Sequence, residues 1–195
     1  MPFRINTVLY AILQFIAFLL VLVATPIDMF RQYPIIISKA ACLTLWGSKR
    51  TCSGLGYDID VTSYWVLCPK SRKRWRRAEL FAILSIFVYG TAFIFGCIKV
   101  YVCGFLRWVC LALNVAGIAT LCVVWGLVVF VYHVPENINC ISLKDFNYHF
   151  GAGLILFLVA WCLNIINIVF AAPCDASVSI EPSNHELSMG EHRRL

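Results

Sequence analysis

Four long apolar segments alternate with polar intervals along the 195-residue chain. They cover residues 5–25, 78–98, 108–132 and 150–172, and each has the roughly 20 residues that a helix needs to cross a hydrocarbon core of about 30 Å. Their interiors contain no Asp, Glu, Lys, Arg or His, each of which is unfavourable at the centre of a membrane helix. The pattern predicts an all-α membrane protein built on a bundle of four transmembrane helices.

Composition supports the same class. Hydrophobic residues make up 61% of the chain and charged residues 13%, and the mean hydropathy is +0.82, whereas soluble domains are about 45–50% apolar and about 25% charged. A soluble globular fold is therefore excluded. The first apolar segment has two interpretations, a cleaved signal peptide or a retained signal-anchor. Its apolar core is longer than that of a signal peptide, and Pro26 follows its small-residue end, so we expect it to be retained.

The polar intervals set the expected organisation of the chain. With four spans, the N-terminal residues 1–4, the short interval 99–107 and the C-terminal tail 173–195 share one side of the membrane. The two longer intervals, 26–77 and 133–149, share the other side. The tail is rich in Ser and Glu and has no apolar period, so it is predicted to be disordered.

Two features of the sequence disagree about which side is cytoplasmic. Ten of the 16 Lys and Arg residues lie in 26–77, and positively charged loops beside spans normally stay in the cytoplasm. The four loop cysteines lie on that same side, and an even set is typical of an oxidising exterior, where disulfides persist. The residues alone leave the sidedness open. The four are Cys42, Cys52, Cys68 and Cys140.

The segment CLTLWGSKRTC, residues 42–52, resembles the signature of the amastins, a family of surface proteins of trypanosomatid parasites. The matching residues are Cys42, Leu43, Thr44, Leu45, Trp46, Gly47, Lys49, Thr51 and Cys52. The order of spans and loops extends the resemblance over nearly the whole chain. It implies a plasma-membrane protein with cytoplasmic termini and both larger loops extracellular, against the charge count, and with a structural or interaction role at the parasite surface.

The chain is also similar to the wider claudin-like tetraspan group, whose first outer loop carries a disulfide over similar spacing. It departs from that group because Trp46 and Gly47 lie between the two cysteines rather than before the first one. A claudin-like role in joining cells is therefore not expected.

Cys42 and Cys52 are the candidates for a disulfide. Zinc sites usually space a ligand pair by two to four residues and require four ligands, so the nine intervening residues and the lack of a nearby His make a metal site a poor fit. We expect a β-hairpin closed by this disulfide, with Trp46 packed on its face. Segments 35–37 and 61–66 flank it and favour β-structure. Cys68 and Cys140 would then form a second pair.

A cluster of basic residues precedes the second span and has two interpretations. It either seats on lipid head groups, with Trp75 as an interfacial anchor, or it faces outward and attracts anionic lipids or glycans of a host membrane. The interval 26–77 carries ten basic and three acidic residues, a net charge of 10 − 3 = +7. The cluster consists of Lys70, Arg72, Lys73, Arg74, Arg76 and Arg77.

Uncharged polar residues inside the spans are the remaining candidates for function. Asn164 and Asn167 are three positions apart and share one helix face. Such amides either hydrogen-bond to a neighbouring span or line a conduction path. The residues are Gln14, Asn114, Asn164 and Asn167. Small residues spaced by four, including Ala112 and Ala116, permit close contact within the bundle or with a second copy.

The sequence contains no motif for catalysis. It has no nucleophile–base pair, phosphate-binding loop, HExxH motif or nucleic-acid-reading module, so neither an enzyme, a bound cofactor or metal, nor a nucleic-acid partner is expected. The expected function is a surface protein of the plasma membrane that organises the bilayer, adheres to a host membrane or self-associates. The alternative is transport of ions, protons or small solutes through the bundle.

The sidedness can be tested with a membrane-impermeant thiol reagent on intact cells. Labelling of Cys42 and Cys52 only after reduction is expected, because an external loop would hold them as a disulfide. If labelling instead requires permeabilisation of the cells but no reduction, the loop is cytoplasmic, as the charge count predicts.

Overall fold

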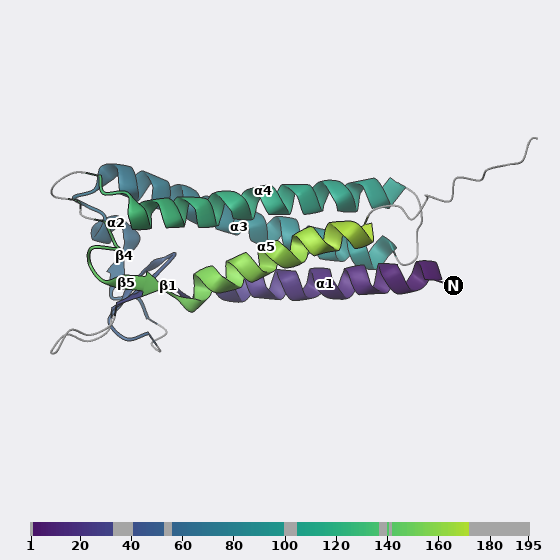
Figure 1. Ribbon diagram of the computed structural model, residues 1–195, viewed down its shortest axis with the longest axis horizontal. Helices are drawn as coiled ribbons and strands as arrows, with labels where there is room; N and C mark the ends of the chain where they lie inside the picture. Colours follow the sequence, from purple (N-terminus) through teal and green to yellow (C-terminus); the bar gives the residue numbers. More distant parts are fainter. Residues whose placement is uncertain are drawn as a thin grey trace, which may run out of the picture.

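The computed structural model describes residues 2–32, 41–52, 56–99, 105–136, 140 and 142–171. Four long helices, α1 (Pro2–Ala24), α3 (Pro69–Lys99), α4 (Phe105–His133) and α5 (Ala152–Ala171), run side by side along the long axis of the molecule (Figure 1). Each helix packs against the ones before and after it, and α5 closes the ring against α1. The result is an antiparallel four-helix bundle.

Each helix is apolar enough to cross a membrane. The candidate spans are Ile5–Ala24, Pro69–Ile98, Leu106–His133 and Ala152–Phe170, and all four helices carry large apolar side chains that are exposed on the outside of the bundle. Exposed apolar surface of this kind is stable only against lipid. The sequence-based prediction of a four-helix membrane protein is therefore confirmed.

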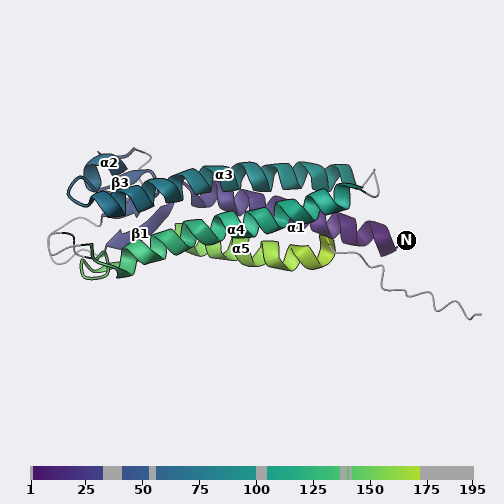
Figure 2. The ribbon, with the colours of Figure 1, turned by 90° about the horizontal axis from the view of Figure 1, so that it is seen from above.

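A small antiparallel sheet and a short helix, α2 (Val61–Tyr64), cover one end of the bundle, opposite the N-terminus of α1 (Figures 1 and 2). The spatial order of the strands is β4-β3-β2-β1-β5. Strand β1 therefore joins the two larger polar intervals, because it pairs with β2 on one side and β5 on the other. The strands are β1 (Asp28–Gln32), β2 (Cys42–Thr44), β3 (Gly47–Lys49), β4 (Ile59–Asp60) and β5 (Tyr148–Phe150). We call the sheet, α2 and the first turns of α3 the cap.

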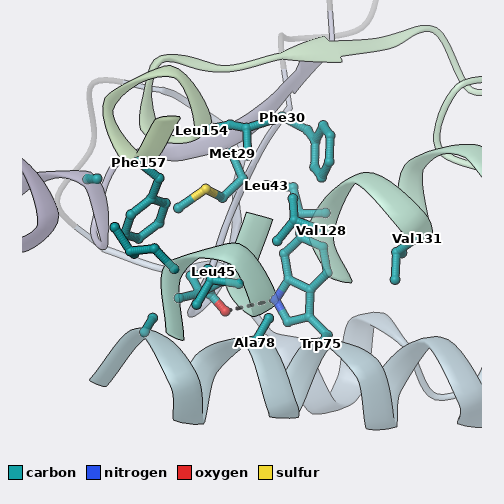
Figure 3. Packing of buried hydrophobic residues seen from close by; sticks show 14 of the residues in the cluster. Met29, Phe30, Leu43, Leu45, Trp75, Ala78, Val128, Val131, Leu154 and Phe157 are labelled. Carbon is teal, nitrogen blue, oxygen red and sulfur yellow. Dashed lines mark hydrogen bonds between the residues drawn. The ribbon is translucent and has the colours of Figure 1, made fainter. Parts of the chain in front are cut away.

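The cap is attached to the bundle through a buried aromatic side chain. Trp75 of α3 is fully buried, and its indole N–H donates a hydrogen bond to the Leu45 carbonyl at 2.8 Å. Figure 3 shows this indole beside Leu45 of the hairpin, with Leu43 of β2 and Val128 of α4 close to it. The ring of Phe30 lies 6.1 Å from that of Trp75 and stacks on Tyr132 at 5.4 Å. The core is therefore continuous from the sheet into the four helices.

The helix α3 begins at Pro69, earlier than the expected span 78–98, because a single buried stripe continues through the basic cluster. Proline is well suited to the first position of a helix, where its missing N–H is not needed. The stripe recurs every three or four residues and comprises Ser71, Trp75, Ala78, Ala82, Ser85 and Tyr89. The interpretation of Trp75 as an interfacial lipid anchor was therefore wrong.

Two further expectations about local structure have clear outcomes. The hairpin closed by a Cys42–Cys52 disulfide is confirmed, with β2 and β3 as its strands. The expectation of β-structure over residues 61–66 was wrong, because Asp60 accepts a hydrogen bond from the Thr62 N–H and caps the short helix α2. The expected β-flank at 35–37 and the expected disordered tail 173–195 lie outside the described residues.

We expect Trp75→Phe to lower the free energy of unfolding by about 2–3 kcal/mol, because it leaves the buried Leu45 carbonyl unpaired and a cavity beside it. Thermal unfolding in detergent, followed by near-ultraviolet circular dichroism, measures the loss. Trp65→Phe is the matched control, since Trp65 is buried in contact with Trp75 but its indole N–H has no partner in the described part of the chain. Equal losses in the two variants would show that the hydrogen bond contributes nothing.

Candidate functional site

The hairpin at residues 42–52 is organised by one hydroxyl group. The Thr44 Oγ1 donates to the Gly47 carbonyl at 2.8 Å and accepts from the backbone N–H groups of Trp46 and Gly47 at 3.2 and 3.1 Å. These bonds fix a two-residue turn, Leu45-Trp46, between β2 and β3. The turn directs the Leu45 carbonyl toward Trp75, so the local hydrogen bonds of Thr44 position the contact that attaches the cap.

Gly47 is required because another strand approaches it closely. A Cβ atom at this position would lie 2.7 Å from the Ile59 carbonyl oxygen of β4, and real Cβ atoms do not approach backbone so closely. Next to it, Lys49 is largely buried and its ammonium lies 4.8 Å from the centre of the Tyr57 ring, a cation–π contact. The signature glycine and lysine therefore hold β4 and its approach segment against the hairpin.

The other signature residues divide into buried and exposed positions. Cys42 and Cys52 are joined by a disulfide with Cα atoms 5.4 Å apart. Leu43 and Leu45 are fully buried in the core, whereas Thr51 is exposed. Trp46, expected to pack on the face of the hairpin, lies at its turn, partly buried against the core cluster. Most of the signature thus describes a folding unit rather than a set of groups directed at a ligand.

A second connection joins the two larger polar intervals beside the start of α3. Cys68 and Cys140 form a disulfide with Cα atoms 5.8 Å apart. Glu136 accepts hydrogen bonds from the backbone N–H groups of Lys70 and Ser71 at 2.9 and 2.8 Å, which satisfies two otherwise unpaired donors at the start of a helix. Burial of the Glu136 carboxyl raises its pKa. The hydrogen bonds outweigh this effect, so the pKa of Glu136 lies below its usual value. The carboxylate therefore stays charged, and α3 capped, until the pH falls through that lowered pKa.

The six basic residues of the predicted patch have different environments on α3. The guanidinium of Arg74 lies 4.5 Å from the centre of the Phe130 ring, and that of Arg76 donates to Thr62 Oγ1 at 3.0 Å. Arg72 is partly buried. The remaining three, at positions i, i+3 and i+7, are exposed and share one helix face. We call Lys70, Lys73 and Arg77 the basic face.

The intramembrane amides lie together inside the bundle, away from the cap. Asn167 donates to Gln14 Oε1 at 2.7 Å, and Asn164 donates to the Asn114 backbone carbonyl at 3.0 Å. Asn114 in turn donates to the Tyr10 hydroxyl at 2.9 Å. These bonds connect α5 with α1 and α4. The predicted intramembrane polar residues therefore form two buried sets of hydrogen bonds, Asn167 with Gln14 and Asn164 with Asn114, separate from the signature hairpin and the basic face.

Several residues that hold the cap together were not identified from the sequence. Phe30 is an isolated apolar residue in the interval 26–77 and Tyr132 is the last residue of an apolar segment, so neither stands out, and the capping role of Glu136 depends on a contact between distant loops. For Asp60 a signal was present, because Asp followed by Val-Thr is a common helix start. Among the described residues no group of three or more His, Cys, Asp or Glu side chains could hold a metal ion.

The chain was compared with known protein families. The model of the family described as "Amastin surface glycoprotein" matches residues 15–171, which include the signature hairpin, the basic cluster and three of the four helices in full. No curated protein matches the chain significantly.

We expect Gly47→Ala to destabilise the cap by about 1–3 kcal/mol, because the new methyl group must push β4 away from β3. Hydrogen–deuterium exchange should show faster exchange at the Asp58 amide, which donates to the Ser48 carbonyl. Gly56→Ala is the matched control, since a Cβ atom there meets nothing within 4 Å. Unchanged exchange at Asp58 in Gly47→Ala would contradict the steric explanation of the signature glycine.

Proposed function

The chain belongs to the amastin family of surface glycoproteins, and we propose that this member is an interaction protein whose cap contacts the anionic surface of an apposed host membrane. The observation that carries the proposal is the basic face, three exposed cations on a helix that is fixed to a disulfide-linked cap. In this proposal the bundle anchors the cap in the parasite plasma membrane, and no chemical step is required.

The proposed sidedness rests on the cysteines. The cap holds two disulfides, Cys42–Cys52 and Cys68–Cys140, and disulfides persist outside the cytosol. The second disulfide joins residues 72 positions apart. Its loss would increase the conformational entropy of the unfolded chain and so destabilise the folded protein. We therefore propose that the cap is extracellular and the termini are cytoplasmic, against the positive-inside count.

The basic face suits a flat anionic partner. Within the part of the chain that the structure describes, no carboxylate forms an ion pair with Lys73 or Arg77, whereas the Glu136 carboxylate, which accepts from the Lys70 N–H, attracts the Lys70 ammonium. The charges of Lys73 and Arg77 are therefore not neutralised by an ion pair, and each Lys or Arg near an anionic membrane contributes about 1 kcal/mol to binding. Lipid head groups and sulfated glycans both supply the required negative charge. Binding to vesicles and binding to heparin, measured separately, distinguish the two partners.

Transport through the bundle is the second candidate, and one observation favours it. The side-chain oxygens of Asn114, Asn164 and Asn167 are buried without partners in the described chain, and such oxygens can hold water. Against it, the two sets of hydrogen bonds contain no charged side chain in the described part of the chain. Proton or ion flux in liposomes that is abolished by Asn164→Leu or Asn167→Leu would favour transport.

Self-association is a further form of interaction that the bundle permits. Ala112 and Ala116 are exposed on α4 rather than packed inside the bundle. Small residues at this spacing allow a helix of a second copy to approach, so crosslinking at these positions would detect a homo-oligomer.

We expect the double variant Lys73→Glu/Arg77→Glu to bind vesicles containing phosphatidylserine at least about 30-fold more weakly than the unmodified chain, because two favourable contacts become repulsive. The measurement uses the full chain in nanodiscs of neutral lipid, with vesicles of phosphatidylcholine with and without phosphatidylserine. Immobilised heparin provides a separate glycan arm.

The matched control is Arg50→Glu/Lys144→Glu, which changes the net charge equally at two exposed cap positions outside the basic face. Equal loss in both double variants would indicate a general charge effect. Binding that neither variant weakens would refute the adhesion proposal.

A further inference from the structure

A pocket of about 400 Å³ opens where the cap meets the outer side of α3. Trp46, from the turn of the signature hairpin, forms one wall, and α2 with its capping residue forms another. Its floor is α3, from Arg76 down to Ile83. It therefore lies where the basic cluster ends and the apolar span begins, at the level expected for lipid head groups.

The polar part of the pocket contains both signs of charge. Arg76 uses one N–H for Thr62, which leaves further guanidinium donors available. Glu79 is partly buried, and in the described part of the chain its carboxylate has no hydrogen bond and no ion pair within 4 Å, although the Arg76 guanidinium attracts it over a longer distance. Asp60 supplies a second carboxylate, which uses one oxygen to cap α2. A carboxylate left unpaired at the edge of a membrane span is costly unless it binds something.

The lower part of the pocket is apolar and continues along the bundle. Leu80 and Ile83 line it, and they begin a stripe of exposed side chains at positions i, i+3, i+7 and i+14 of α3 that includes Phe87 and Ile94. Leu80 is 64% exposed and Phe87 67% exposed. An acyl chain leaving the pocket would lie along this stripe.

We propose that this pocket is a binding site for a zwitterionic phospholipid of the protein's own bilayer, with an ethanolamine head group. The phosphate binds the free donors of Arg76, and the primary ammonium lies between the carboxylates of Glu79 and Asp60, beside the Trp46 ring. A charge-assisted hydrogen bond requires N–H donors, which a primary ammonium has and a choline group lacks. The ring adds cation–π attraction for either head group. The two acidic groups disfavour an anionic lipid.

The site differs from the basic face in partner and position. The basic face is proposed to contact an opposing anionic surface, whereas the pocket opens toward the bilayer in which the helices lie. The two can therefore fail independently.

Native mass spectrometry of the full chain in detergent tests the pocket. The protein is titrated with phosphatidylethanolamine, phosphatidylcholine and phosphatidylglycerol that carry the same acyl chains. We expect retention of phosphatidylethanolamine over the other two. Glu79→Gln should reduce the preference over phosphatidylcholine at least tenfold, whereas Arg76→Gln should lower retention of both, because it removes the phosphate contact.

Arg50→Gln is the matched control, since Arg50 is an exposed arginine near the hairpin that neither lines the pocket nor belongs to the basic face, and it should behave as the unmodified chain. Thermal unfolding in the same detergent confirms that each variant is folded. If Glu79→Gln does not fold, Arg76→Gln still tests the phosphate contact, and the lipid preference of the unmodified chain still tests the head-group selectivity. Equal retention of the three lipids by the unmodified chain, or a preference that Glu79→Gln leaves unchanged, overturns the proposal.

Discussion

The hydrogen bond between the Trp75 indole and the Leu45 carbonyl is the contact on which the arrangement of the cap depends. It is completely buried, so neither group could recover the interaction from water if the sheet shifted. It also joins two levels of the structure. Leu45 is presented by a turn that the Thr44 hydroxyl fixes, and Trp75 lies on a helix that continues into the membrane. The position of the cap is thereby set by a membrane helix rather than by the loops alone.

The cap and the interior of the bundle use polar groups in opposite ways. At the cap, α3 has a carboxylate from another loop on its first N–H groups, a disulfide beside them and cations on its outer face. Deeper in the bundle, the polar groups are amides and hydroxyls without charge, paired between helices, as in the bond from Asn167 to Gln14. Charge is therefore confined to the level where water and head groups can solvate it, and uncharged hydrogen bonds are used where they cannot.

The spans and the hairpin could be predicted from sequence because each depends on a local rule. A hydrophobic core about 30 Å thick imposes a minimum length on any spanning helix, and Cys42 and Cys52 are close in sequence. The pairing of Cys68 with Cys140 could be proposed only from the shared side of the membrane. The orientation of Trp75 was predicted wrongly, because a tryptophan among six cations is typical of a membrane interface. Its burial follows from the stripe that includes Ser71 and Ala78, which the surrounding charges conceal in the sequence.

The same stripe explains why one run of basic residues could not be assigned a single role from sequence. Once Trp75 faces the core, helix geometry fixes the direction of each neighbour. Arg74 is directed at the Phe130 ring and Arg76 at Thr62, whereas Lys73 and Arg77 are directed outward. Two of the cations are therefore already engaged within the protein, and one of them, Arg76, lines a pocket that also contains the Glu79 carboxylate. A charge count over the run overestimates the surface available to an anionic partner, and it misses the pocket, because both depend on the rotation of α3 about its axis.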